Sequence, residues 1–513
     1  MASRLYFRPR MVRLLCLLLA LIATALATAH PARAIDLTAG TEAELNAAIA
    51  AVNAAGAGTH TITLTADITL TDWSTKFDNP AATVIIIDGD GHTIDGGGND
   101  TESILYIAAG TTARVRDVTL TNAQASEGGG ILNAGTLTVE GSHITANEVT
   151  IAGGGIYSTG QLTIIDTTIS DNSAIDYGGG IALAGEVMGL TMQNSTLAGN
   201  EAHGAGGGLI AVNGQAQVIV LTNVTFDGNL SANGAGGAEF FAGDGGELTV
   251  TISNSRLVNN AGYHGALSID SSGVAEVTVS GSTVGGNRST AADGLTRSAG
   301  GGIYAMARTG GTTLLTLFNS TVSGNSTDRA GGGLLVAADG SEARTRANVV
   351  YSTLANNTAG AGGDGIHTMT ANGGVASVLL SATIITNAPG TGPDCARPSG
   401  AIISNGFNLA SDDTCFPIED EDSDLIASEA GLLPLALNAP GTTPTHALSV
   451  TSPALNRIPP GGLGCGTAIS ADQRGVARPQ PAGGRCDIGA FERRPGETPE
   501  FRGYLPLARG SGQ

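Results

Sequence analysis

The 513-residue sequence is poor in lysine, in aromatic residues and in charge of either sign. Lys76 is its only lysine, aromatic residues make up 4 % and charged residues 13 %. Its 24 basic and 45 acidic residues give a formal charge of −21, which excludes a basic nucleic-acid footprint. With 41 % hydrophobic residues, the chain is neither disordered nor a coiled coil. Its 77 glycines are too few for a collagen and suit an all-β protein rich in turns.

Long apolar runs are also lacking, except near the N-terminus. Leu14 to Ala29 form an apolar run that follows a basic segment and precedes two small-residue cleavage sites, ending at Ala29 and Ala34. This order is typical of a secretory signal, and the run is short for a membrane span. We therefore predict a signal peptide over residues 1–34, no transmembrane span after its cleavage, and a secreted or cell-surface protein. A retained N-terminal anchor is the alternative.

Cysteine is scarce and confined to two places. Cys16 lies in the predicted signal peptide, and the other four, in the last quarter, are Cys395, Cys415, Cys465 and Cys486. Four cysteines permit three pairings, and export makes disulfides plausible. Pairing of sequence neighbours would close loops of about 20 residues and stabilise by roughly 3 kcal/mol each. The alternative, a zinc site, lacks a C-x-x-C pair and a nearby histidine cluster.

A repeated pattern fills the middle of the chain. Its cleanest copy reads Gly153-Gly154-Gly155-Ile156, then Leu162-Thr163-Ile164, then Thr168-Ile169-Ser170-Asp171-Asn172. Apolar residues lie ten, eight and three positions before the asparagine. Further copies, the last with one apolar position lost, are Leu137/Val139/Ile144/Asn147, Leu190/Met192/Leu197/Asn200, Ile219/Leu221/Phe226/Asn229, Val250/Ile252/Leu257/Asn260, Val277/Val279/Val284/Asn287, Leu315/Leu317/Val322/Asn325, Ala347/Val349/Leu354/Asn357 and Ser377/Leu379/Ile384/Asn387.

This pattern predicts a right-handed parallel β-helix with one coil per repeat. Leu-Thr-Ile alternation indicates a strand with one buried face, and a unit this short buries that face only by stacking on its neighbours. The stack would hold roughly twelve coils. The units are too short for propeller blades. Asparagines at one turn position can bond from coil to coil, so we predict a structural ladder of Asn147, Asn172, Asn200, Asn229, Asn260, Asn287, Asn325, Asn357 and Asn387.

The solenoid needs covered ends. Thr41 and Glu44 form a capping box, and Leu45, Ile49 and Val52 follow on one helical face. The sequence therefore predicts a short capping helix and a small disulfide-bearing C-terminal domain. The expected division is signal peptide 1–34, N-terminal cap 35–60, parallel β-helix 61–390, C-terminal cap and second domain 391–492, and tail 493–513.

Two stretches resemble known families. The Gly-Gly-Gly-Ile and asparagine elements, over about residues 60–390, resemble the repeats of polymorphic outer-membrane-type proteins and of secreted right-handed β-helix proteins. In the C-terminal region, Ser452-Pro453-Ala454, Asp472-Gln473-Arg474-Gly475 and Cys486-Asp487-Ile488-Gly489-Ala490-Phe491-Glu492 resemble the choice-of-anchor Q domain, although Asn456 stands where that family usually has Asp. The second resemblance implies display on a bacterial surface.

Candidate site residues are acidic and histidine side chains in the turns after the asparagines. Polysaccharide-cleaving β-helices need clustered carboxylates, in some cases with Ca²⁺. The catalytic candidates on this pattern are Asp328, Asp364 and His264. Asp420, Asp422 and Asp424, in the densest acidic run, are candidate Ca²⁺ ligands, and no other cofactor is predicted. Solvated turns and a solvated linker are the alternatives.

The expected function is that of a non-catalytic, adhesin-like or glycan-facing scaffold whose partner is a polysaccharide or cell-surface glycan, with no nucleic acid bound. The alternatives are a polysaccharide lyase or glycoside hydrolase that uses carboxylates on the coil turns, and a surface spacer. The near absence of lysine counts against a β-eliminating lyase. The sequence does not indicate an oligomeric state.

Overall fold

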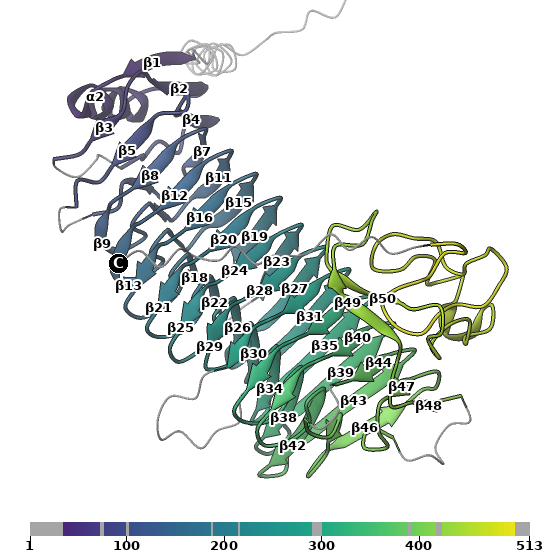
Figure 1. Cartoon of the computed structure of the whole chain (residues 1–513). Coiled ribbons are helices and arrows are strands. Elements are labelled where there is room, and N and C mark those ends of the chain that lie inside the picture. The colour runs from purple at the N-terminus through teal and green to yellow at the C-terminus, as the bar shows by residue number, and fades with distance from the viewer. Residues whose placement is uncertain are drawn as a thin grey trace, which may run out of the picture.

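The chain winds into an elongated solenoid whose strands stack into parallel sheets along its whole length (Figure 1). The computed structural model describes residues 34–71, 76–98, 102–185, 188–213, 216–289, 300–387, 391–416 and 423–497. A full coil places one strand in each of four parallel sheets, which we name A, B, D and C in chain order. The predicted all-β, right-handed parallel β-helix of about 12 turns is confirmed.

Within each sheet the strands stack in chain order, one coil on the next. Sheet A contains β1 (Ile35–Ala39), β2 (Thr59–Leu64), β4 (Val84–Asp88), β7 (Thr112–Arg116), β11 (Thr136–Glu140), β15 (Gln161–Ile165), β19 (Met188–Gln193), β23 (Ala216–Thr222), β27 (Glu247–Ser253), β31 (Val274–Ser280), β35 (Thr312–Phe318), β39 (Arg344–Val350), β43 (Val375–Ser381) and β46 (Ala401–Ser404). Sheet B contains β3 (Ile68–Thr69), β5 (Thr93–Asp95), β8 (Thr119–Thr121), β12 (His143–Thr145), β16 (Thr168–Ser170), β20 (Thr196–Ala198), β24 (Thr225–Asp227), β28 (Arg256–Val258), β32 (Thr283–Gly285), β36 (Thr321–Ser323), β40 (Thr353–Ala355), β44 (Ile384–Thr386), β47 (Leu409–Ala410) and β48 (Leu425–Ile426). Sheet C contains β6 (Leu105–Ile107), β10 (Ile131–Asn133), β14 (Ile156–Ser158), β18 (Ile181–Gly185), β22 (Leu209–Asn213), β26 (Ala238–Ala242), β30 (Leu267–Ser271), β34 (Ile303–Arg308), β38 (Leu334–Asp339), β42 (Ile366–Ala371) and β45 (Cys395–Ala396). Sheet D contains β9 (Gln124–Glu127), β13 (Glu148–Ala152), β17 (Ser173–Ala174), β21 (Glu201–Ala202), β25 (Leu230–Ser231), β29 (Ala261–Gly262), β33 (Arg288–Ser289), β37 (Ser326–Thr327) and β41 (Thr358–Ala359).

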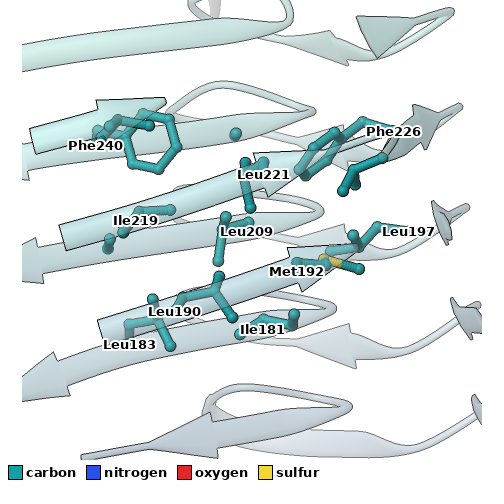
Figure 2. Packing of buried hydrophobic residues seen from close by; sticks show 14 of the residues in the cluster. Ile181, Leu183, Leu190, Met192, Leu197, Leu209, Ile219, Leu221, Phe226 and Phe240 are labelled. Atoms are coloured by element: carbon teal, nitrogen blue, oxygen red, sulfur yellow. The ribbon is translucent and has the colours of Figure 1, made fainter. Parts of the chain in front are cut away.

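The core is a column of aliphatic side chains inside the coils. In eight repeats the two apolar residues of the sheet A strand and the one of the sheet B strand point inward and lie on their counterparts in the next coil (Figure 2). In the ninth repeat the expected register was wrong by one residue, because Val378, Leu380 and Ile385 lie on Ala347, Val349 and Leu354 and are buried in the core. Leu190, Met192 and Leu197, for example, are at most 1 % exposed and pair in register with Ile219, Leu221 and Phe226. Each such side chain stabilises the fold by about 1.5–3 kcal/mol through burial.

The predicted asparagines form a continuous hydrogen-bonded column. From Asn147 to Asn325, each Nδ2 donates to Oδ1 of the next asparagine over 2.8–3.1 Å. The same Nδ2 donates to a carbonyl of the preceding coil, as Asn172 does to Ile144 at 2.9 Å. At the end of the column the backbone N–H of Asn357 donates to Oδ1 of Asn387. The amides of this column are therefore both buried and satisfied, which buried polar groups require.

The N-terminal end is covered by the predicted helix. Helix α2 (Glu42–Asn53) begins after Thr41, whose hydroxyl accepts the backbone N–H of Glu44 at 3.3 Å. Its apolar face, formed by Leu45, Ile49 and Val52, is fully buried against the first coils. The capping helix is therefore confirmed. None of the helices in the described ranges has the length and apolar character needed to cross a bilayer.

The C-terminal region carries two disulfides that join sequence neighbours, Cys395–Cys415 and Cys465–Cys486. The first closes the last coils, and the second lies in a separate hydrophobic cluster. Because all four cysteines are oxidised in pairs, the zinc alternative does not apply. Strands β45 to β48 extend the solenoid to Ile426, beyond the expected boundary at 390.

The chain then turns back along the outer face of sheet B, beside β32, β36 and β40 (Figure 1). This part, residues 430–497, contains the antiparallel pair β49 (Leu432–Ala436) and β50 (Thr445–Leu448) and the 3₁₀ turn Gly462–Gly464. Most of it has no regular structure. We call it the docked region.

Candidate functional site

A cleft of about 400 Å³ opens on the outer face of sheet C. Its floor is built by outward-facing side chains of five successive strands, β26, β30, β34, β38 and β42, and its rim by the turns that precede the strands. It is lined by Asn233, Glu239, Tyr263, His264, Asp270, Tyr304, Met306, Arg308, Ala337, Ala338, Asp339, Met369 and Ala371.

Strand alternation and coil stacking bring these residues together. In β26 the side chains of Ala238 and Phe240 are buried in the core, so Glu239 between them faces outward. The parallel register places Glu239 beside Ser268 of the next coil and Ser268 beside Tyr304 of the coil after that. Residues far apart in the sequence thus form a continuous polar row, and the next outward row holds Asp270 and Met306.

The strongest polar contact in the cleft joins Asp270 and Arg308. Nε of Arg308 donates to both carboxylate oxygens of Asp270, at 2.8 and 2.9 Å, and Nη2 donates to Oδ2. The Asp270 side chain is 8 % exposed, whereas that of Arg308 is 42 % exposed. The pair engages Nε and Nη2 of Arg308, and the partly exposed side chain lines the cleft.

Glu239 carries the most strongly perturbed carboxyl group in the cleft. One of its oxygens accepts the backbone N–H of Ala235 at 2.8 Å. Burial, aided by the negative charge of Asp270, raises the pKa of Glu239 to about 7. Near neutral pH this carboxyl is therefore present in both forms, and its protonated form can donate a hydrogen bond.

His264 lies flat against Tyr304. Their rings are parallel within 2°, with centroids 4.2 Å apart, and Tyr263 contacts the His264 ring edge-on. The Nδ1 atom of His264 is 3.2 Å from the Ser268 hydroxyl. Burial, with a smaller contribution from the charge of Arg308, lowers the pKa of His264 to about 4. The imidazole is therefore neutral above pH 5, and the aromatic pair gives the cleft a rigid wall.

The cleft thus combines an aromatic and methionine surface with planar polar groups. Tyr304, Met306 and Met369 supply the apolar part, and three carboxyl groups surround one guanidinium. Such a mixture suits a ligand with apolar faces and hydroxyl edges, since the polar groups fix orientation and the aromatic ring supplies contact area.

The sequence-predicted catalytic candidates lie in three different environments. His264 lines the cleft. Asp328 lies in an exposed turn. Asp364 is 1 % exposed and accepts the backbone N–H groups of Ala359 and Gly392 at 2.7 and 2.6 Å. Both of its oxygens are used to hold neighbouring turns, so the structure gives Asp364 a structural role. No hydrogen bond or ion pair within the described ranges joins these three residues to one another.

The predicted calcium run is only partly described. Asp420 and Asp422 lie outside the described residues. Oδ1 of Asp424 accepts the backbone N–H of Asn408 at 2.8 Å and its Nδ2 at 3.2 Å. Among the residues that the structure describes, no three histidine, cysteine, aspartate or glutamate side chains are grouped so that they could hold a metal ion.

Sequence reasoning missed Glu239, Asp270, Tyr304 and Arg308. The predicted candidates lie in the turns after the asparagines, whereas these residues lie on the strands that follow the glycine-containing turns before sheet C. The available signal was a charged or aromatic residue at an outward position of such a strand, as in Gly236-Gly237-Ala238-Glu239. Aligning the sheet C strands of successive repeats places these residues in adjacent rows.

Comparison with known proteins supports the fold and goes no further. Residues 67–229 match the family model of the right-handed β-helix region. This segment covers the coils from β3 to β24. No curated protein and no solved structure matches the chain.

Proposed function

We propose that this protein binds a neutral saccharide in the sheet C cleft and is displayed outside the cell. The observation that carries the proposal is the cleft itself, with its stacked Tyr304–His264 wall beside the Asp270–Arg308 pair. Three carboxyl groups outnumber the single guanidinium, so an acidic sugar would be repelled at neutral pH. A ligand with hydroxyl groups and no charge fits this balance.

Binding without turnover is favoured by the state of Asp270. A carboxylate that attacks a sugar or activates water needs an oxygen free of strong donors, and Arg308 donates to both oxygens of Asp270. The resemblance of residues 425–492 to the choice-of-anchor Q domain, and that of residues 1–34 to a signal peptide, support secretion and surface display. The repeats that resemble polymorphic outer-membrane-type proteins fit an adhesin-like scaffold.

Glycoside hydrolysis is the second candidate, because burial raises the pKa of Glu239 to about 7, so this carboxyl is partly protonated at neutral pH. A carboxyl group with a raised pKa is what a general acid requires, and glycosidases use it together with a second carboxyl group. Release of reducing ends that stops in Glu239→Gln, while the saccharide still binds, would establish this activity in place of simple binding.

The proposal is tested by calorimetry of the secreted form with a panel of neutral and acidic oligosaccharides. We expect a neutral member to bind, and the double variant Asp270→Asn/Arg308→Gln to lose about 10-fold or more in affinity, about 1.4 kcal/mol. The matched control is Glu276→Gln/Arg344→Gln on the outer face of sheet A, where both side chains are exposed. No binding across the panel, or an equal loss in the control variant, would refute a sheet C saccharide site.

A further inference from the structure

A second cavity, of about 690 Å³, lies between the solenoid and the docked region. One wall is formed by sheet B and the turn that follows it, the other by residues 428–435 and His446. Gly286 and Gly324, at equivalent turn positions of successive coils, leave room that side chains would fill. The leucines of β49 make one wall apolar, and Asn356 lines the cavity as an exposed amide.

A serine–histidine pair lines this cavity. The Oγ atom of Ser323, on β36, lies 2.8 Å from Nε2 of His446, on β50. The Nδ1 atom of His446 lies 2.7 Å from the carbonyl oxygen of Leu433, which can only accept. Nδ1 therefore carries the proton, and Nε2 is left as the acceptor for the Ser323 hydroxyl. A hydroxyl, a base within hydrogen-bond distance and a third group that orients the base are the arrangement of an activated nucleophile.

This pair differs from the neighbouring contacts between sheet B and the docked region. Thr283 donates to the carbonyl of Pro444 at 2.6 Å, and Thr321 donates to the amide oxygen of Gln473 at 2.6 Å. Those acceptors only hold the surfaces together, since an amide or carbonyl oxygen does not take up a proton near neutral pH. Ser323 alone among these three hydroxyls faces a base, and it also borders the cavity.

We propose that Ser323 and His446 hydrolyse carboxylic esters with small apolar acyl groups in this cavity. Ser323 Oγ forms a bond to the ester carbonyl carbon while its proton passes to Nε2 of His446. The bond from that carbon to the alkoxy oxygen then breaks, and the alcohol leaves with the proton. Water attacks the acyl-serine and gives a proton to Nε2, which returns it to Oγ as the carboxylic acid departs.

Other features of the cavity agree with this chemistry. The amide of Asn356 is the candidate donor to the oxyanion that develops on the carbonyl oxygen. Leu432, Leu433 and Leu435 provide the apolar surface for the acyl group. Burial lowers the pKa of His446, with the Leu433 carbonyl opposing this in part, so the base is neutral at neutral pH.

The first test is covalent labelling of the folded protein with a fluorophosphonate probe, followed by peptide mass spectrometry. We expect the label on Ser323, and hydrolysis of p-nitrophenyl acetate or butyrate by the unlabelled protein. A folded protein that takes no label and turns over neither ester, or a label on another residue, would overturn the proposal. This outcome is independent of saccharide binding in the sheet C cleft.

Variants separate catalysis from docking. Ser323→Ala and His446→Gln should each lower kcat/KM about 100-fold or more. The control Thr283→Val removes a docking bond of the same kind and should leave kcat/KM unchanged. Since His446→Gln could also loosen the docked region, Ser323→Cys serves as a second variant that keeps a nucleophile and should react with iodoacetamide. Unchanged turnover in Ser323→Ala would overturn the proposal.

Discussion

The solenoid and the docked region are stabilised in different ways. In the solenoid each coil repeats the contacts of its neighbour, with buried aliphatic columns and the asparagine ladder. In the docked region nothing repeats, and a disulfide and buried ion pairs join its irregular segments. A repeated stack gains a similar increment from every interface between coils. A small irregular region has no repeated interfaces whose contributions add up, so its stability depends on a few strong, specific contacts.

The links of the docked region are formed by the motif residues of its sequence. Arg474 contacts Asp472 at 2.9 Å and lies over the Phe491 ring, 3.5 Å from its centroid. Arg478 contacts Glu492 at 2.9 Å and lies over Tyr351 of the solenoid. All four charged side chains are fully buried. The motif therefore encodes the interior of the docked region as well as its attachment to the solenoid.

The largest effect is expected from Arg478→Met. This change leaves Glu492 buried without its counterion, and the carbonyls of Asp487 and Gly489 lose the donors that Arg478 supplies. Removing one partner of a buried pair destabilises by about 3–5 kcal/mol. Hydrogen exchange should show loss of protection over residues 430–497 while the coils before β28 keep theirs.

The matched control is Arg494→Met. Its partner Glu497 is 2.9 Å away, but the Arg494 side chain is 45 % exposed, so the loss should stay below about 1 kcal/mol. If Arg478→Met instead lowered amide protection in the solenoid and in the docked region to the same extent, the two regions would unfold as one cooperative unit. The proposed difference between them would then be wrong.

The next effect concerns the solenoid. In Asn229→Ala, the backbone N–H and Nδ2 of Asn200 lose their common acceptor, at 3.0 and 2.9 Å, and the Leu197 carbonyl loses its donor. Leaving such buried groups unsatisfied costs about 3 kcal/mol in total. Urea unfolding followed by circular dichroism measures the loss, and hydrogen exchange should place it in the coils around β24.

Asn223→Gly is the control for this asparagine. Asn223 is exposed, has φ of 54° and donates to Asn194 at 2.9 Å. Glycine accepts this φ without strain, so only a solvent-exposed hydrogen bond is lost, and the effect should be under about 1 kcal/mol. Equal losses at Asn223 and Asn229 would mean that burial of the ladder is unimportant.

The same contrast explains what the sequence could predict. The period of Leu162, Ile164 and Ile169 against Asn172 appears in eight copies, so coil, core and ladder followed from repetition. Neighbour pairing of the cysteines was one of three possibilities, and the structure selects it. The docking of Gln473 on Thr321 joins residues 152 positions apart and leaves no periodic trace. In the docked region, only the local sequence motifs were recognisable.

The sheet C cleft was missed for a different reason. Glu239 and Arg308 lie at outward strand positions, which the apolar repeat pattern does not include. These residues form a site only because the strand register places Glu239, Ser268 and Tyr304 side by side. A ligand site on a solenoid is therefore formed by outward-facing residues from successive coils. It can be recognised in the sequence only when the repeats are aligned with one another.

The smallest effect, confined to the solenoid, is on the pH dependence of stability. The pKa of Glu239 in the fold, about 7, lies above its ordinary value of 4.5, so the folded chain binds more protons between these pH values. Its contribution to stability therefore falls as pH rises through this range. His264, lowered from 6.5 to about 4, works in the opposite direction, and its contribution falls as pH decreases from 6.5 to 4. In the wild-type protein the two slopes largely cancel.

Single variants should uncover each slope. Glu239→Gln leaves the His264 effect, so unfolding free energy should rise with pH between 4 and 6.5, whereas His264→Gln should show a fall between 4.5 and 7. Each change amounts to about 1–3 kcal/mol across its range. Urea unfolding in steps of half a pH unit measures both, and contributions from other groups cancel when the two variants are subtracted. Parallel curves for the two variants would show that neither side chain titrates differently in the folded cleft.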